Sequence, residues 1–170
     1  MNSKNIILIG MPGAGKSTIG VLLAKTLGKE FIDTDLLIQA QEKKLLQKLI
    51  DEYGIERFLG IEAAVILGLQ INNAVIATGG SAIYSEQAVN HLKQNGIAVY
   101  LKLTYEEIER RIKNMASRGV VIGEGQSLVD LYRERVPKYE SHADVVFDCS
   151  GKSIEDLVRI ITEKLRSFGS

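Results

Sequence analysis

The residues best suited to chemistry form a glycine-rich run near the N-terminus, from Gly10 to Ser17. This run, GMPGAGKS, matches the Walker A pattern and lies between an apolar segment of strand length and a segment of helical period. Glycines allow successive backbone N–H groups to point inward around a phosphate, and the positive end of the following helix strengthens that attraction. The pattern predicts a nucleotide phosphate site lined by Gly13, Ala14, Gly15, Lys16, Ser17 and Thr18.

Two side chains at the end of this run have predicted chemical roles. Lys16 can reach the β- and γ-phosphates of ATP as a point charge, and the Ser17 hydroxyl can bind Mg²⁺. The alternative is a glycine-rich turn that precedes a lysine without function, but the strand–turn–helix context argues against it. ATP and Mg²⁺ are therefore the expected cofactors, and phosphoryl transfer to a hydroxyl of a small metabolite is the expected activity.

A pair of carboxylates, Asp33 and Asp35, closes the second predicted strand. Residues two apart in extended backbone project from the same face, and strand ends of this kind line the ligand crevice of a doubly wound sheet. One carboxylate can organise magnesium and its waters, and the other can accept the proton of an attacking hydroxyl. The alternative is helix capping by Asp35, which precedes an apolar helical run.

Weaker signals follow further along the chain. The glycine pair Gly79-Gly80 comes after the third predicted strand and can bring backbone close to a ligand, although two glycines also mark plain turns. Spacing alone does not choose among the arginines that could clamp an anion, because arginines on amphipathic helices are usually solvated. These candidates are Arg110, Arg111, Arg118, Arg133 and Arg135. The stretch between Met115 and Leu128, with three glycines in seven residues, reads either as a plain surface loop or as a mobile lid.

The elements that must position these groups alternate along the chain. Apolar runs of strand length are Ile6–Ile9, Phe31–Asp33, Ala74–Thr78, Ala98–Leu103 and Val145–Asp148. Segments of helical period are Lys16–Leu27, Glu56–Ile71, Ser85–Asn95, Tyr105–Met115, Leu128–Tyr139 and Ile154–Ser167, with a weaker stretch over Leu36–Tyr53. Apolar strands separated by helices predict an α/β sandwich, a parallel sheet covered on both faces. With no linker or repeat, we expect a single domain over residues 1–170.

Composition excludes several classes of function. Twenty-one basic residues balance twenty-one acidic ones, so no global positive field would attract nucleic acid or an anionic membrane surface. The N-terminal apolar stretch, Ile6–Ile9, is too short for a signal peptide or a membrane span. The single cysteine, Cys149, allows no internal disulfide and argues against a structural zinc site. We expect a cytoplasmic monomer whose partner is a small hydroxylated substrate, with neither nucleic acid nor membrane as a partner.

The order of these motifs resembles the shikimate kinase family. The resemblance runs from Ile6 to about Leu165, and the residues that carry it are Gly10–Ser17, Asp33–Asp35, Ala77–Gly80 and Arg135–Tyr139. It implies a P-loop kinase sandwich whose five-stranded parallel sheet has the order 2-3-1-4-5, with a mobile lid over approximately residues 115–127. It also implies ATP-dependent phosphorylation of the 3-hydroxyl of shikimate, giving shikimate 3-phosphate and ADP.

The resemblance implies residue roles as well. Asp33 would lie in the magnesium shell, and Asp35 would bind the acceptor hydroxyls and serve as the base. Arg111 would lie along the adenine ring, and Arg118 would be the lid arginine that acts with Lys16 on the transferred phosphoryl group.

On the acceptor side, Arg135 would grip the carboxylate of shikimate, beside Gly79 and Gly80.

The acceptor half also departs from the family. Leu59 stands where the family has a carboxylate-binding arginine, Ile50 where it has an aromatic residue, and Ser81 where it has a third glycine. Arg57 is two positions from Leu59, on nearly the opposite side of a helix, and so cannot replace that arginine. Three readings stay open: a shikimate kinase with a weakened carboxylate clamp, a relative that phosphorylates another hydroxylated metabolite, or a non-catalytic ATP-binding switch.

Overall fold

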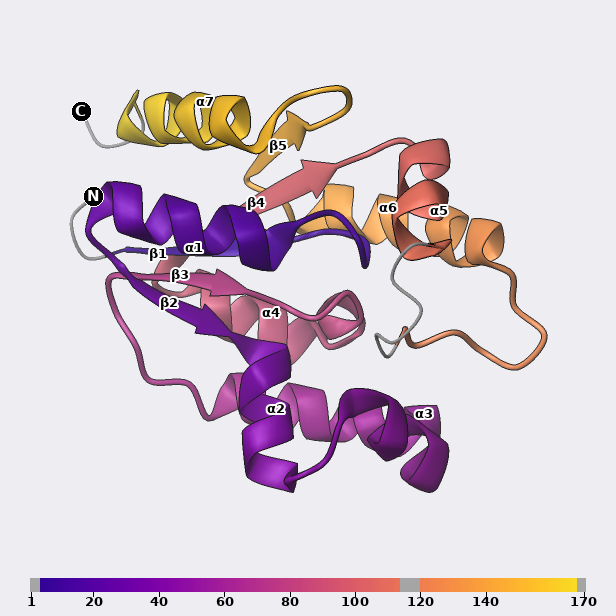
Figure 1. Ribbon diagram of the computed structural model, residues 1–170. Helices are drawn as coiled ribbons and strands as arrows, with labels where there is room; N and C mark the ends of the chain where they lie inside the picture. Colours follow the sequence, from indigo (N-terminus) through magenta and orange to yellow (C-terminus); the bar gives the residue numbers. More distant parts are fainter. Residues whose placement is uncertain (1–3, 114–119, 168–170) are drawn as a thin grey trace.

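The computed structural model describes residues 4–113 and 120–167 and contains one parallel sheet with the strand order β2-β3-β1-β4-β5 (Figure 1). The strands are β1 (Asn5–Ile9), β2 (Glu30–Asp33), β3 (Ala74–Ala77), β4 (Gly96–Lys102) and β5 (Val145–Asp148). The four strand pairings of the described sheet are all parallel, and central strands β1 and β3 are buried throughout. The predicted fold class and strand order are confirmed.

Helices cover both faces of the sheet. They are α1 (Lys16–Leu27), α2 (Thr34–Glu42), α3 (Leu46–Leu67), α4 (Glu86–Lys93), α5 (Tyr105–Lys113), α6 (Leu128–His142) and α7 (Ile154–Ser167), with a short 3₁₀ turn η1 (Ala82–Tyr84). Helix α1 packs beside α7 on one face, and α4 and α6 lie behind the sheet in Figure 1. Right-handed crossovers explain this division, because the chain moves toward β2 after α1 and in the opposite direction after α4 and α6. None of the described helices is long and apolar enough to cross a membrane.

Helix α3 differs most from the sequence prediction. It begins at Leu46 instead of Glu56 and absorbs much of the stretch expected to be weakly helical. Gly54 interrupts it with φ 78° and ψ 166°, so the helix bends there. Such dihedrals are accessible to glycine at no steric cost. Helical periodicity reads the spacing of apolar residues and not backbone dihedrals, so it could not locate the bend.

A small second core lies beside the main one. Its buried members are Ile38, Leu49, Phe58 and Val121, from α2, both parts of α3 and the segment before α6. Leu59 and Ile50, the two apolar departures noted above, pack as half-buried members of this cluster. The cluster therefore anchors α2 and α3 next to the carboxyl ends of the strands.

Candidate functional site

The glycine-rich run forms a tight loop between β1 and α1. Gly10, Gly13 and Gly15 have φ angles of 148°, 81° and 87°, which side-chain-bearing residues rarely adopt. A Cβ on Gly10 would also lie 2.8 Å from the Leu101 carbonyl oxygen. The loop therefore requires glycine for conformation and for close approach, as the Walker A pattern predicts. Ala14 is buried at its centre, and Thr18 is exposed in the first turn of α1.

Lys16 is folded back over this loop. Its Nζ donates to the carbonyl oxygens of Gly10 and Met11 at 2.7 and 2.9 Å. Burial lowers the pKa of its ammonium from 10.5 to about 8, and the nearby Asp35 carboxylate opposes that shift. An incoming phosphate would add further negative charge beside this buried amine and so favour its charged form.

Ser17 and Asp33 form an oxygen pair at the base of the loop. The Ser17 Oγ donates to Asp33 Oδ2 at 2.6 Å. Asp33 Oδ1 accepts from the backbone N–H groups of Asp35 and Leu36, so Asp33 is the N-cap of α2. The capping alternative was therefore correct in kind but named the wrong residue, since Asp35 lies in the first turn of α2.

This oxygen pair fits a magnesium site. Mg²⁺ takes few protein ligands and completes its shell with waters and phosphate oxygens, so one hydroxyl and one carboxylate suffice. Within residues 4–113 and 120–167, no three His, Cys, Asp or Glu side chains gather in a way that could bind a metal. A closed, all-protein metal cage is thus absent from the described part of the chain.

Asp35 lies next to Gly79 and not in a strand as expected. A Cβ on Gly79 would lie 2.7 Å from Asp35 Oδ1 and 2.2 Å from Glu62 Oε1. Gly79 N–H donates to the buried Thr34 Oγ1 at 3.1 Å, which ties the glycine pair to the start of α2. The sequence prediction that Asp33 and Asp35 share one strand face was wrong, because α2 begins at Thr34, two residues earlier than the apolar pattern suggests.

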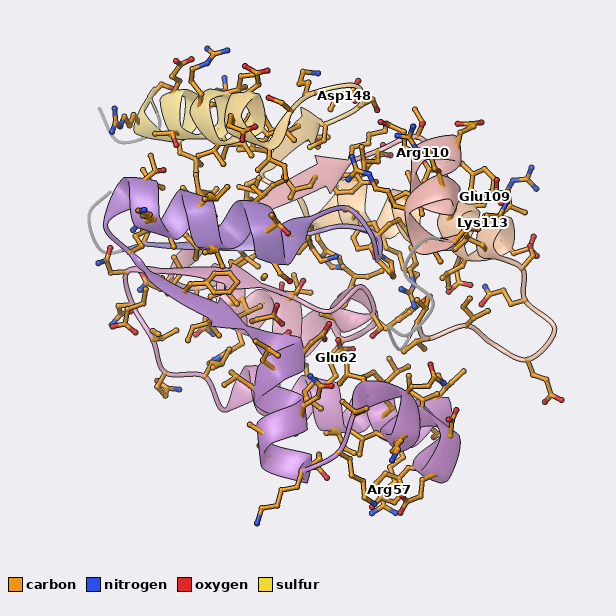
Figure 2. The ribbon with its side chains drawn as sticks, viewed as in Figure 1. Arg57, Glu62, Glu109, Arg110, Lys113 and Asp148 are labelled. Atoms are coloured by element: carbon orange, nitrogen blue, oxygen red, sulfur yellow. The ribbon has the colours of Figure 1, made fainter. Side chains whose placement is uncertain are left out.

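Glu62 is a site residue that the sequence motifs did not single out. Its side chain lies on the side of α3 that faces the sheet, whereas Arg57 lies on the outer side (Figure 2). Glu62 is 1% exposed, and its Oε2 accepts from Ser81 Oγ at 2.6 Å. Burial raises the pKa of this carboxyl to about 7, against the lowering effect of Ser81. The available signal was its spacing of four from Phe58 and Ile66, which places a carboxylate on the buried face of a helix.

Arg135 lies at the opposite wall of the site, buried on α6. Its Nη2 donates to the Val121 carbonyl oxygen at 2.8 Å, and its Nε donates to Tyr84 Oη at 3.2 Å. A Cβ on Gly80 would lie 3.0 Å from Arg135 Nη1. Tyr139 Oη in turn donates to the Gly80 carbonyl oxygen at 2.6 Å. The structure therefore brings Arg135 and the glycine pair together.

The remaining arginines separate into different places. Arg111 Nη1 donates to the Gly13 carbonyl oxygen at 3.2 Å, so it lies against the phosphate loop. Arg110 is exposed and points away from the site (Figure 2), with its Nη2 4.0 Å from Oε1 of the half-buried Glu107. Arg133 is exposed on α6. The lid arginine of the prediction, Arg118, lies outside the described residues, as does part of the expected lid.

The site thus combines a phosphate loop, an oxygen pair for Mg²⁺, an acidic group and an arginine at the carboxyl end of one parallel sheet. The charges of Asp35, Arg135, Asp33 and Glu62 all act on Lys16. Such an arrangement of groups can bind a nucleoside triphosphate and an anionic alcohol side by side, which is the geometry of phosphoryl transfer.

Comparison with known proteins agrees with this chemistry. The family model described as shikimate kinase matches residues 12–166. The shikimate kinase of Caldanaerobacter subterraneus is 36% identical over 97% of this chain and 96% of that protein. The shikimate kinase of Thiobacillus denitrificans is 35% identical over 95% of this chain and 90% of that protein.

A solved structure is also similar. The shikimate kinase from Acinetobacter baumannii in complex with shikimate superposes with a TM-score of 0.87 at 32% identity, covering 96% of this chain and 93% of that one.

Proposed function

This chain belongs to the shikimate kinase family, and from that premise we propose how its residues transfer the terminal phosphoryl group of ATP to the 3-hydroxyl of shikimate. The products are shikimate 3-phosphate and ADP. The observation that carries the proposal is the convergence of Lys16, Asp35 and Arg135 around the glycine pair. Nothing in the comparisons favours another acceptor or a non-catalytic switch.

The nucleotide half binds and orients ATP. Backbone N–H groups of the run from Gly13 to Thr18 surround the phosphates, and Lys16 exchanges its carbonyl partners for phosphate oxygens. Arg111, already placed against the loop, lies along the adenine ring. Ser17 and Asp33 would hold Mg²⁺, whose charge would neutralise the phosphate oxygens.

The acceptor half binds shikimate and receives its proton. Asp35 binds the acceptor hydroxyls and accepts the proton of the attacking one, and the backbone of Gly79 and Gly80 allows the sugar-like ring to approach closely. Arg135 binds the carboxylate. We further propose that residues 115–127 form a lid whose Arg118 acts on the charge of the transferred group. All these groups come from one chain, which favours a functional monomer.

The test is release of ADP with and without acceptor. We expect shikimate to stimulate ADP release by wild-type protein far above the rate with other hydroxylated metabolites. Asp35→Asn should retain ATP affinity and lose about 10²–10⁴-fold in turnover, because the amide keeps the size but not the basic oxygen. ATP binding without shikimate-stimulated turnover in the wild-type protein would reject the proposal.

A further inference from the structure

The Arg135 guanidinium is held by hydrogen bonds at two of its nitrogens, and its third nitrogen lies beside Gly80. Nη2 donates to Val121 and Nε donates to Tyr84, and Nη1 is the nitrogen next to Gly80. On the proposed function, which this inference takes as its basis, Nη1 points to where the substrate carboxylate binds. The orientation of the arginine therefore depends on Val121 and on what fixes Tyr84.

Tyr84 is fixed by Glu134, the residue that precedes Arg135 on α6. Tyr84 Oη donates to Glu134 Oε1 at 2.6 Å while it accepts from Arg135 Nε. The Arg135 guanidinium carbon also lies 5.2 Å from the centre of the Tyr84 ring. One hydroxyl thus links a cation to a carboxylate, and each hydrogen bond polarises the other.

The same carboxylate reaches the segment before α6. Gln126 Nε2 donates to Glu134 Oε2 at 2.7 Å, and Gln126 Oε1 accepts from Gly123 N–H at 3.1 Å. Val121, the other partner of Arg135, belongs to this segment too. Both hydrogen-bond partners of the arginine are therefore connected to residues 121–126: Val121 belongs to them, and Tyr84 is linked to them through Glu134.

We propose that Tyr84 and Glu134 act as a positioning pair that sets the direction of the Arg135 guanidinium and so controls affinity for the carboxylate of the acceptor. In the structure the pair acts on the guanidinium of Arg135 through the hydrogen bond from Nε to Tyr84 Oη. Burial and the Glu134 carboxylate both raise the pKa of Tyr84, which keeps its hydroxyl protonated and able to donate.

The first experiment measures kinetics of Tyr84→Phe, which retains the ring over Arg135. We expect the KM for shikimate to rise about five- to tenfold, with the KM for ATP unchanged. Only the binding of the substrate carboxylate depends on the orientation of Arg135. The matched control is Tyr105→Phe, which deletes a similar hydroxyl–glutamate hydrogen bond, 3.0 Å to Glu109, within α5 and without Arg135 as a partner. Equal KM changes in the two variants, or none in either, would overturn the proposal.

A double-mutant cycle tests whether Glu134 acts through Tyr84. Glu134→Ala should raise the KM for shikimate several-fold alone and add little in the Tyr84→Phe background. Additive effects would mean that the two residues act independently. Arg135→Lys separates this inference from the proposed function: an unchanged KM for shikimate in that variant would reject the role of Arg135 itself. A raised KM there with normal Tyr84→Phe kinetics would reject only the positioning pair.

Discussion

At the scale of single residues, ionisable side chains make ATP binding and stability depend on pH. Lys16 is the first of these residues. Its pKa of about 8 means that the free protein loses this charge as the pH rises through 8. We expect affinity for ATP to fall above that pH, by up to about tenfold per pH unit, because only the charged amine attracts phosphate. Calorimetric titration with ATP across this range measures it.

The matched variant is Lys16→Met, which keeps the length of the buried side chain. It should lose phosphoryl transfer and show ATP binding that no longer depends on pH in this window. A wild-type affinity that stays flat through pH 8 would place the pKa of Lys16 elsewhere.

The pKa of Glu62 is raised, whereas that of Lys16 is lowered, and the shift of Glu62 affects the stability of the protein. Its pKa is about 7 in the folded protein against 4.5 ordinarily, so folding favours the protonated form. The folded state binds more protons between these values, and stability falls as the pH rises from 4.5 to 7. Glu62→Gln should therefore gain stability relative to wild type across that window, by up to about 3 kcal/mol.

The measurement is the free energy of unfolding in urea as a function of pH. Glu56→Gln is the control, since Glu56 is exposed on the same helix. If the Glu62→Gln difference did not change with pH, burial of an ionised Glu62 would cost nothing.

At the scale of elements, the bend in α3 sets where Glu62, Phe58 and Leu59 lie. Gly54 is at φ 78° and ψ 166°, a conformation that strains any side-chain-bearing residue even though a Cβ there meets no atom within 4 Å. Gly54→Ala should destabilise the protein by about 1–3 kcal/mol. Gly60→Ala, on the same helix and also in open space, should instead stabilise it by about 0.5–1 kcal/mol.

Thermal and urea denaturation of the two variants give both values. Opposite signs are the decisive outcome, because helix propensity alone would make both substitutions stabilising. Similar stabilisation in both would mean that α3 can straighten at Gly54 without cost.

At the scale of the whole molecule, the proposed function brings the nucleotide and acceptor halves together around one phosphoryl group. On the proposed lid role, Arg118→Ala should lower kcat by about 10²–10³-fold and change nucleotide affinity little, because a lid arginine acts on charge that develops during transfer. Single-turnover kinetics measure the effect on phosphoryl transfer, and a separate ATP titration measures the effect on nucleotide affinity. Equal losses in binding and turnover would contradict the role.

Local pattern was enough to predict much of this protein. The Walker A run needs only consecutive residues to define its loop, and alternating apolar strands and helices predict a parallel sheet through general packing rules. The strand order 2-3-1-4-5 came from the resemblance and is confirmed. The roles of the individual site residues remain predictions.

Tertiary structure alone decided which distant groups meet. Asp35, Glu62 and Gly79 come from three separate elements, and no spacing in sequence brings their atoms within contact distance. The resemblance had pointed to Arg135, but only the tertiary structure shows that its side chain is buried while those of Arg110 and Arg133 are exposed. The physical reason is that periodicity reports whether a face is buried but not against what, so the pairing of buried polar groups appears only when the helices are docked on the sheet.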